Sequence, residues 1–261
     1  MEPQETHQHA PSENVSTPVT SDQNTTAGTQ TNTLAAAIVT SAAMIAIALV
    51  IALHPHAAAN AGTAQPAAQQ PAVAPDISKV NITGEPFIGN ANAPVTIAYW
   101  FDYQCPFCRQ DEQTALPQII TNYVTTGKVK IVFKDFAFLG PDSQTVGIYA
   151  RAVWAAAPDQ FYAWHKAIFD TQGKEGSGWA SQAKIASITQ STLGVTTAAK
   201  VAQLVQTNGA TYQKAIDADK AEAQAFGIDG TPATLIGTQV ITGAQPYANF
   251  DTAIKAALKT K

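Results

Sequence analysis

The fold of this chain is decided at residues 103–109, which read Tyr-Gln-Cys-Pro-Phe-Cys-Arg and hold the only two cysteines among 261 residues. The apolar run 95–101 directly before them predicts a buried strand. Pro106 predicts a helix that begins at Cys105 or Pro106, because proline is tolerated in the first helical turn. A thiol at a helix N-terminus lies beside unpaired N–H groups and the positive end of the helix dipole, which favours the thiolate. We therefore expect one thiol of this pair to be reactive.

Two other uses of the cysteine pair fit the sequence less well. A purely structural disulfide would close so short a loop that it constrains the unfolded chain little. A tetrahedral zinc site needs four ligands, and the chain has no second pair of cysteines. His54 and His56 lie in a polar linker without further ligands. We predict no metal site.

The pattern after the cysteines predicts an α/β domain. A helix that continues to Gly127, bent at Pro117, connects the strand 95–101 to a second strand at 128–136, which makes the two strands parallel. Helical periodicity then fills residues 142–227, and breaks divide this block into about five helices. Those breaks are expected at Pro158, 173–178, Gly194 and 208–209.

Strand patterns resume after the helical block. Residues 233–236 and 239–242 predict an antiparallel hairpin with a tight turn at 237–238, and residues 247–259 predict a closing amphipathic helix. The helical block thus interrupts one sheet, so it is expected to be an inserted subdomain. Pro232, just before the resumed strand, marks a special backbone position because proline cannot feed a central ladder.

The first 78 residues divide into three segments of different composition. Residues 1–33 are rich in Thr, Gln, Asn and Ser and predict a disordered tail. Residues 34–53 form an uncharged, apolar run. This run is long enough for a transmembrane helix of about 30 Å. Residues 54–78, rich in Ala, Pro and Gln, predict a linker to a domain at 79–261.

The apolar segment 34–53 has three interpretations. We favour a signal anchor that stays in the membrane, because the run is longer than an ordinary signal-peptide core. The small residues 57–59 leave a cleaved signal as an alternative, and a buried soluble helix is a third. Charges do not give the orientation, since the first basic residue is Lys79.

Charge excludes one class of partner. The formal net charge is −4, and all fifteen Lys and Arg residues lie from Lys79 onward without forming a basic stripe. Proteins that neutralise phosphates need such a stripe. Nucleic acid is therefore not an expected partner.

In this order of elements the chain resembles the DsbA-like branch of the thioredoxin fold, and most of all its membrane-tethered bacterial thiol-disulfide oxidoreductases. The matching residues span roughly 85–261 and include the Cys-Pro-Phe-Cys motif and the sequence Gly230-Thr231-Pro232. The resemblance implies a thioredoxin fold with a helical insertion between its β-α-β and β-β-α halves. It leaves the tail and the apolar segment unexplained.

The resemblance also implies roles for particular residues. Cys105 is expected to be the nucleophile, and Cys108 the buried thiol that resolves mixed disulfides. Thr231 and a cis Pro232 are expected to lie against the pair and receive substrate backbone, with Pro106 and Phe107 supporting the site. The redox group is then the Cys105–Cys108 disulfide itself, with no other cofactor.

The implied partners follow from this chemistry. They are reduced or unfolded exported proteins, a membrane or exported protein that reoxidises the dithiol, and the membrane through residues 34–53. The catalytic domain is expected on the extracytoplasmic side. Its redox potential is expected toward the oxidising end of the range of thioredoxin-fold proteins. An isomerase, a reductase, or a non-catalytic tethered peptide-binding protein are the alternatives.

The sequence departs from this family at one position. Six residues before the first cysteine, where the family commonly carries a buried carboxylate for proton transfer, this chain has Tyr99. Proton transfer would then come from water or from Asp102, although we interpret Asp102 as structural. We expect His165 to be packed in or beside the core rather than catalytic.

Overall fold

The computed structural model describes residues 74–261. The predictions for 1–33 and 34–53, and for most of the linker 54–78, lie outside the described residues. Of the helices within 74–261, none is long and apolar enough to cross a membrane. The sequence predicts that the domain begins at residue 79, but the chain already contacts the sheet at Ile77. This residue begins a 3-10 turn, Ile77–Lys79, and its N–H donates to the Gly237 carbonyl oxygen at 2.8 Å.

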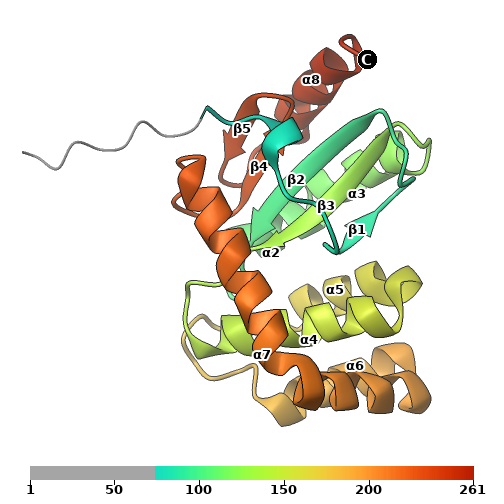
Figure 1. The fold of residues 1–261 in the computed structure, drawn as a ribbon, viewed down its shortest axis with the longest axis vertical. Helices are drawn as coiled ribbons and strands as arrows, with labels where there is room; N and C mark the ends of the chain where they lie inside the picture. Colours follow the sequence, from blue (N-terminus) through green and yellow to red (C-terminus); the bar gives the residue numbers. More distant parts are fainter. Residues whose placement is uncertain (1–73) are drawn as a thin grey trace, which may run out of the picture. The chain divides into compact units, whose positions relative to one another are not determined.

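A five-stranded mixed sheet forms the centre, in the order β1-β3-β2-β4-β5 (Figure 1). β2 and β3 are parallel, and β4 forms an antiparallel hairpin with β5, as the sequence predicts. β4 also pairs antiparallel with β2, which was not predicted. The antiparallel edge strand β1 was not predicted, because its two residues adjoin a turn-rich segment. The strands are β1 Phe87–Ile88, β2 Val95–Phe101, β3 Val129–Asp135, β4 Ala233–Ile236 and β5 Gln239–Thr242.

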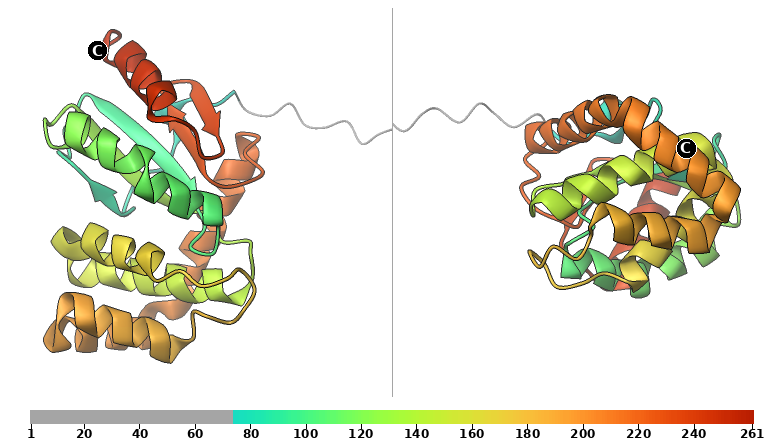
Figure 2. Two further views of the ribbon diagram at one scale, coloured as in Figure 1. Left: turned by 180° about the vertical axis from the view of Figure 1, so that it is seen from behind. Right: turned by 90° about the horizontal axis from the view of Figure 1, so that it is seen from below.

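Side chains of β2 alternate between two cores. Tyr99 and Phe101 join the larger core, and Ala98 and Trp100 join a smaller core on the opposite face. Helices α2, α3 and α8 cover the first face, whereas α7 crosses the second (Figures 1 and 2). Both faces of β2 are covered, which explains why its sequence is apolar at nearly every position.

The helix after the cysteines is interrupted, and the interruption differs from the prediction. α2 spans Pro106–Gln113 and α3 spans Ala115–Ile119, followed by a π-helical turn at Ile120–Val124. The break falls at Thr114, not as a bend at Pro117. A proline ring clashes with the carbonyl group four residues earlier in a continuous helix. The break places Pro117 in the first turn of a new helix, where that clash does not arise.

The helical insertion contains four α-helices and one 3-10 turn at Pro158–Gln160. The predicted breaks near Pro158, at 173–178 and at Gly194 are confirmed, but the break at 208–209 is wrong, because α7 continues through it. A glycine inside a helix costs only about 1 kcal/mol relative to alanine, and α7 packs along α4 and α6. The helices are α4 Pro141–Ala156, α5 Phe161–Asp170, α6 Gln182–Leu193 and α7 Val195–Ala225, and α8 at Tyr247–Leu258 closes the domain.

Candidate functional site

The two cysteines lie where the chain leaves β2 and enters α2. Cys105 is the N-cap residue of α2, and Pro106 is its first residue, as expected. Both cysteines are free thiols. Cys105 is 4% exposed and Cys108 is completely buried, whereas the Phe107 side chain between them is 59% exposed. The site therefore presents an apolar ring to solvent beside a shielded dithiol.

The two thiols have opposite acidities. The pKa of Cys105 is lowered to about 6, first by the hydrogen bond from the Cys108 thiol, against the effect of burial, and then by Thr231 and the N–H groups of Cys108 and Phe107. The pKa of Cys108 is raised well above its usual value, first by burial and then by the same hydrogen bond to Cys105. At neutral pH, Cys105 is mainly a thiolate and Cys108 a thiol.

The segment at Thr231 and Pro232 lies across from the cysteines. The Thr231–Pro232 peptide bond is cis, as expected from the resemblance. The Cys105 Sγ lies 3.4 Å from the Thr231 carbonyl oxygen. The structure thus brings Cys105, Cys108 and Thr231 together, and Pro232 is buried immediately before β4.

Asp102 is a structural residue, as the sequence analysis expects. Its carboxylate accepts hydrogen bonds from the backbone N–H groups of Gln104, Phe138 and Leu139 and from the Ser143 hydroxyl, at 2.6–3.1 Å. Both oxygens are occupied by these donors. Asp102 therefore fixes the loop before the cysteines to the start of the insertion.

Two glutamines that the sequence analysis missed hold the backbone around Cys105. Gln172 donates to the carbonyl oxygens of Tyr103 and Cys105, at 2.8 and 3.1 Å. Gln104 donates to the Leu139 carbonyl oxygen at 2.8 Å and accepts from the Gly176 N–H at 3.0 Å. Their sequence neighbours carry no signal for these contacts, which depend on how the insertion folds back.

His165 is a completely buried core residue, which confirms the structural interpretation. Its Nδ1 is 2.9 Å from the Tyr103 hydroxyl, and its Nε2 is 2.8 Å from a Glu112 carboxylate oxygen. The other oxygen of Glu112 accepts from the Tyr162 hydroxyl at 3.3 Å. This polar chain joins α2 to α5 beneath the site, and Glu112 was not expected from the sequence.

Three buried polar atoms near the cysteines lack hydrogen-bond partners among residues 74–261. They are the Tyr99 hydroxyl oxygen, the Asp111 Oδ1 and the Thr231 Oγ1. Burial raises the pKa of Tyr99 well above its usual value, and so does the charge on Cys108. Asp111 was not predicted as a site residue, because a carboxylate on a helix is ordinarily solvated.

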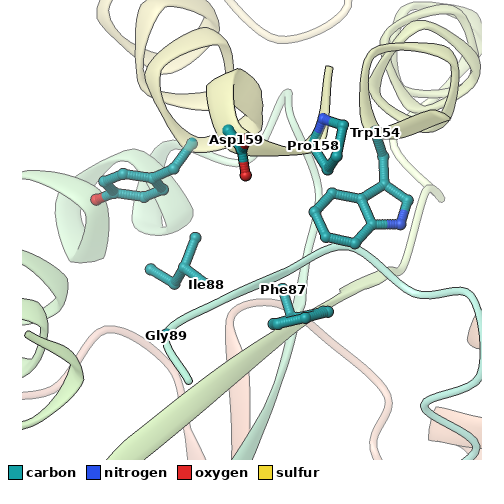
Figure 3. A pocket seen from close by; sticks show the side chains of 7 residues that line it. Phe87, Ile88, Gly89, Trp154, Pro158 and Asp159 are labelled. Atoms are coloured by element: carbon teal, nitrogen blue, oxygen red, sulfur yellow. The ribbon is translucent and has the colours of Figure 1, made fainter. Parts of the chain in front are cut away.

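An apolar cavity lies elsewhere in the domain. It has a volume of about 530 Å³ and lies where β1 meets the turn between α4 and α5 (Figure 3). Phe87 and Trp154 lie next to each other in its lining, with their rings packed edge to face and the ring centroids 5.2 Å apart (Figure 3). None of the six predicted site residues lines this cavity. This cavity is therefore separate from the cysteine site.

A thioredoxin-like sheet with a helical insertion, and a Cys-x-x-Cys pair facing a cis-proline, define the DsbA-like thiol-disulfide oxidoreductases. A family model described as Thioredoxin matches residues 81–256. The chain belongs to this thioredoxin family, and it is a DsbA-like thiol-disulfide oxidoreductase.

Known proteins similar to this chain agree with that assignment. Disulfide bond formation protein D of Bacillus subtilis (strain 168) is 26% identical over 69% of this chain and 80% of its own. Probable disulfide bond formation protein D of Bacillus cereus is 26% identical over 65% of this chain and 75% of its own. The crystal structure of oxidised BdbD from Bacillus subtilis superposes with a TM-score of 0.63 at 25% identity, covering 72% of this chain and 98% of BdbD.

Proposed function

We propose that this chain introduces disulfides into exported proteins by exchange through Cys105-Pro106-Phe107-Cys108. The observation that carries the proposal is the lowered pKa of Cys105, about 6. A stable thiolate favours the reduced dithiol, so the disulfide form is a strong oxidant. The names of the two Bacillus relatives, which are disulfide bond formation proteins, support the same direction.

The reaction assigns one role to each cysteine. A substrate thiolate attacks the Cys105 Sγ of the Cys105–Cys108 disulfide, a mixed disulfide forms, and Cys108 leaves. A second substrate thiolate then attacks the substrate sulfur of the mixed disulfide, and Cys105 leaves as a thiolate. The substrate loses two electrons and the protein gains them. A protein disulfide partner must then take these electrons to regenerate the oxidant.

Neighbouring residues would hold the substrate during this exchange. The Phe107 ring is exposed beside the thiols and offers apolar contact. The backbone of Thr231 and Pro232 lies against Cys105 and provides a place for substrate backbone. Pro106 has no N–H group and occupies the first position of α2, where an N–H group would be unpaired within the helix. The next N–H groups, those of Phe107 and Cys108, donate to the Cys105 sulfur.

We also propose that residues 34–53 anchor the protein in the membrane, with the catalytic domain on the extracytoplasmic side. The support is the uncharged apolar run and the oxidising chemistry, which suits compartments outside the cytosol. After alkaline extraction, the full chain should stay with the membranes, and a variant without 34–53 should be released. A mature chain that begins just after Ala59 would instead indicate a cleaved signal.

Trapping of mixed disulfides tests the exchange. With oxidised glutathione, the Cys108→Ala variant of the full chain should accumulate one glutathione on Cys105, detected by mass spectrometry. Cys105→Ser is the matched control and should accumulate none at the same position. A peptide-binding protein with incidental cysteines would show no stable adduct in Cys108→Ala.

The redox potential tests the direction. Equilibration with glutathione should place the pair nearer to about −120 mV than to about −270 mV, the two ends of the thioredoxin-fold range. The protein should also catalyse oxidation of a reduced, unfolded model substrate. A potential near the lower end would contradict the oxidase and indicate a reductase.

A further inference from the structure

Cys108 leaves or attacks as a completely buried sulfur. Its side chain is completely buried, and burial raises its pKa well above the usual value. When the disulfide opens, the Cys108 sulfur therefore needs a proton at once, and when the disulfide closes it must lose one. A side chain in the same buried region can supply and take this proton.

Asp102, Glu112 and Tyr99 are poorly suited to this role. Both oxygens of Asp102 accept hydrogen bonds from the loop that follows. Both oxygens of Glu112 are occupied by His165 and Tyr162. The hydroxyl of Tyr99 is unpartnered among residues 74–261, but its raised pKa keeps its proton in place near neutrality.

Asp111 differs from these groups in its geometry. It lies three residues after Cys108 on α2, and residues at this spacing share one face of a helix. The side chain is only 2% exposed, and its Oδ1 has no hydrogen-bond partner among the described residues. On β2, the Tyr99 hydroxyl feels the charges of Cys108, then Glu112, then Asp111 and Cys105, which places these groups around one buried position.

We propose that Asp111 is the buried carboxyl group that exchanges a proton with the Cys108 sulfur during disulfide exchange. This inference rests on the proposed function of the cysteine pair. As the Cys105–Cys108 bond breaks, the Asp111 carboxylic acid protonates the departing Cys108 thiolate and later regains a proton from solvent. As the bond reforms, the Asp111 carboxylate takes the Cys108 proton, Cys108 attacks the Cys105 sulfur of a mixed disulfide, and the partner leaves as a thiolate.

The acidity of Asp111 suits this exchange at neutral pH. Its pKa is raised to about 8, first by burial and then by the charge of Glu112, with a smaller contribution from Cys105. The backbone N–H of Gln245, which reaches it from the loop before α8, favours the charged form and opposes the rise. An acid whose pKa lies near the working pH is both a usable donor and a usable acceptor.

A stopped-flow experiment separates the two steps of reoxidation. The reduced full chain is mixed with oxidised glutathione, quenched with acid and analysed by mass. Formation of the glutathione adduct at Cys105 depends on the glutathione concentration, whereas closure by Cys108 does not. In Asp111→Asn we expect closure to slow by roughly 10²-fold, the lower range for loss of a general acid or base, and adduct formation to be unchanged.

Two further variants make the test specific. Asp111→Glu should restore part of the closure rate, because it restores a carboxyl group. Glu112→Gln should keep a step in the pH dependence of closure but move it below pH 8, because the charge of Glu112 raises the pKa of Asp111, whereas Asp111→Asn should lose the step. Unchanged closure in Asp111→Asn would overturn the inference, and so would disappearance of the step, rather than its shift to lower pH, in Glu112→Gln.

The outcomes also separate this inference from the proposed function. If wild-type protein formed no adduct at Cys105, the proposed function would fail before Asp111 came into question. If Asp111→Asn did not fold, the infrared carboxyl band of the wild-type protein would test whether Asp111 exchanges the proton. A protonated carboxyl that titrates near pH 8, and moves when the cysteines are oxidised, supports the proton exchange, and the absence of such a band overturns it.

Discussion

Cys105 and Thr231 are 126 positions apart in the chain, yet the Cys105 sulfur lies 3.4 Å from the Thr231 carbonyl oxygen. The antiparallel pairing of β2 with β4, in which Trp100 is opposite Ala233, creates this contact. The helical insertion separates these two strands in sequence. The Thr231 side chain lowers the pKa of Cys105, so the acidity of the thiol depends on both halves of the sheet.

Replacing Thr231 by valine should raise the pKa of Cys105. The Thr231 side chain favours the thiolate, and valine keeps the shape without the hydroxyl. We expect a rise of up to about one unit, which corresponds to about 1.4 kcal/mol, together with a less oxidising potential. Thiolate absorbance at 240 nm measures the titration. Thr238→Val, on the exposed turn of the same hairpin, should leave it unchanged.

The reactivity of reduced Cys105 should rise through about pH 6 rather than near pH 9. Because folding lowers this pKa, the thiolate stabilises the reduced protein fully above about pH 9, and this contribution is lost as the pH falls through 6. The rate of carbamidomethylation of Cys105 is measured as a function of pH in the wild type and in Cys108→Ala. The comparison tests whether the Cys108 hydrogen bond lowers the pKa of Cys105. Without the Cys108 hydrogen bond, the midpoint should move to higher pH, and an unmoved midpoint would contradict the assignment.

Asp111→Asn should make the protein more stable at pH 8. Folding raises the pKa of Asp111 from about 4 to about 8, so the stability contributed by its protonated form is lost as the pH rises across that interval. The variant has no such loss. Urea unfolding should show similar stabilities at pH 4 and an advantage of at least about 1 kcal/mol for the variant at pH 8. A constant difference across pH would contradict the raised pKa.

A buried ionic cluster holds α7 to the sheet on the face opposite the cysteines. Lys134 and Arg151 pair with the carboxylates of Glu85, Asp135, Asp219 and Glu222. Arg151→Met would leave buried carboxylates without their cation, and we expect a loss of about 3–5 kcal/mol in urea unfolding. Lys166→Met removes an exposed pair with Asp170 and should cost less than about 1 kcal/mol.

Local patterns in the sequence predict the strands and the redox motif because these depend on neighbours in the chain. The bounds of β2, β4 and β5 follow from apolar runs and turn residues, and the N-cap position of Cys105 follows from Pro106. The uninterrupted course of α7 through Gly209 does not follow from local patterns, because packing against α4 and α6 outweighs the low helix propensity of glycine.

The surroundings of the site were harder to predict than its thiols. A carboxylate such as Asp111 has the same sequence signature whether it is buried or solvated, and only the docking of α8 and the hairpin decides which. Gln172 likewise contacts Cys105 through a loop whose path depends on the whole insertion. Such residues are determined by long-range packing, which a single sequence does not display.

The unbroken course of α7 has a consequence for cooperativity. Its 31 residues extend for roughly 46 Å, with Val201 in the larger core and Ala223 in the smaller one. Opening the insertion would therefore disturb the helix that also covers the sheet. We expect the slowest-exchanging amide protons of α6 and β2 to share one opening free energy, so that this redox domain unfolds as a single foldon and not as a core with a detachable cap.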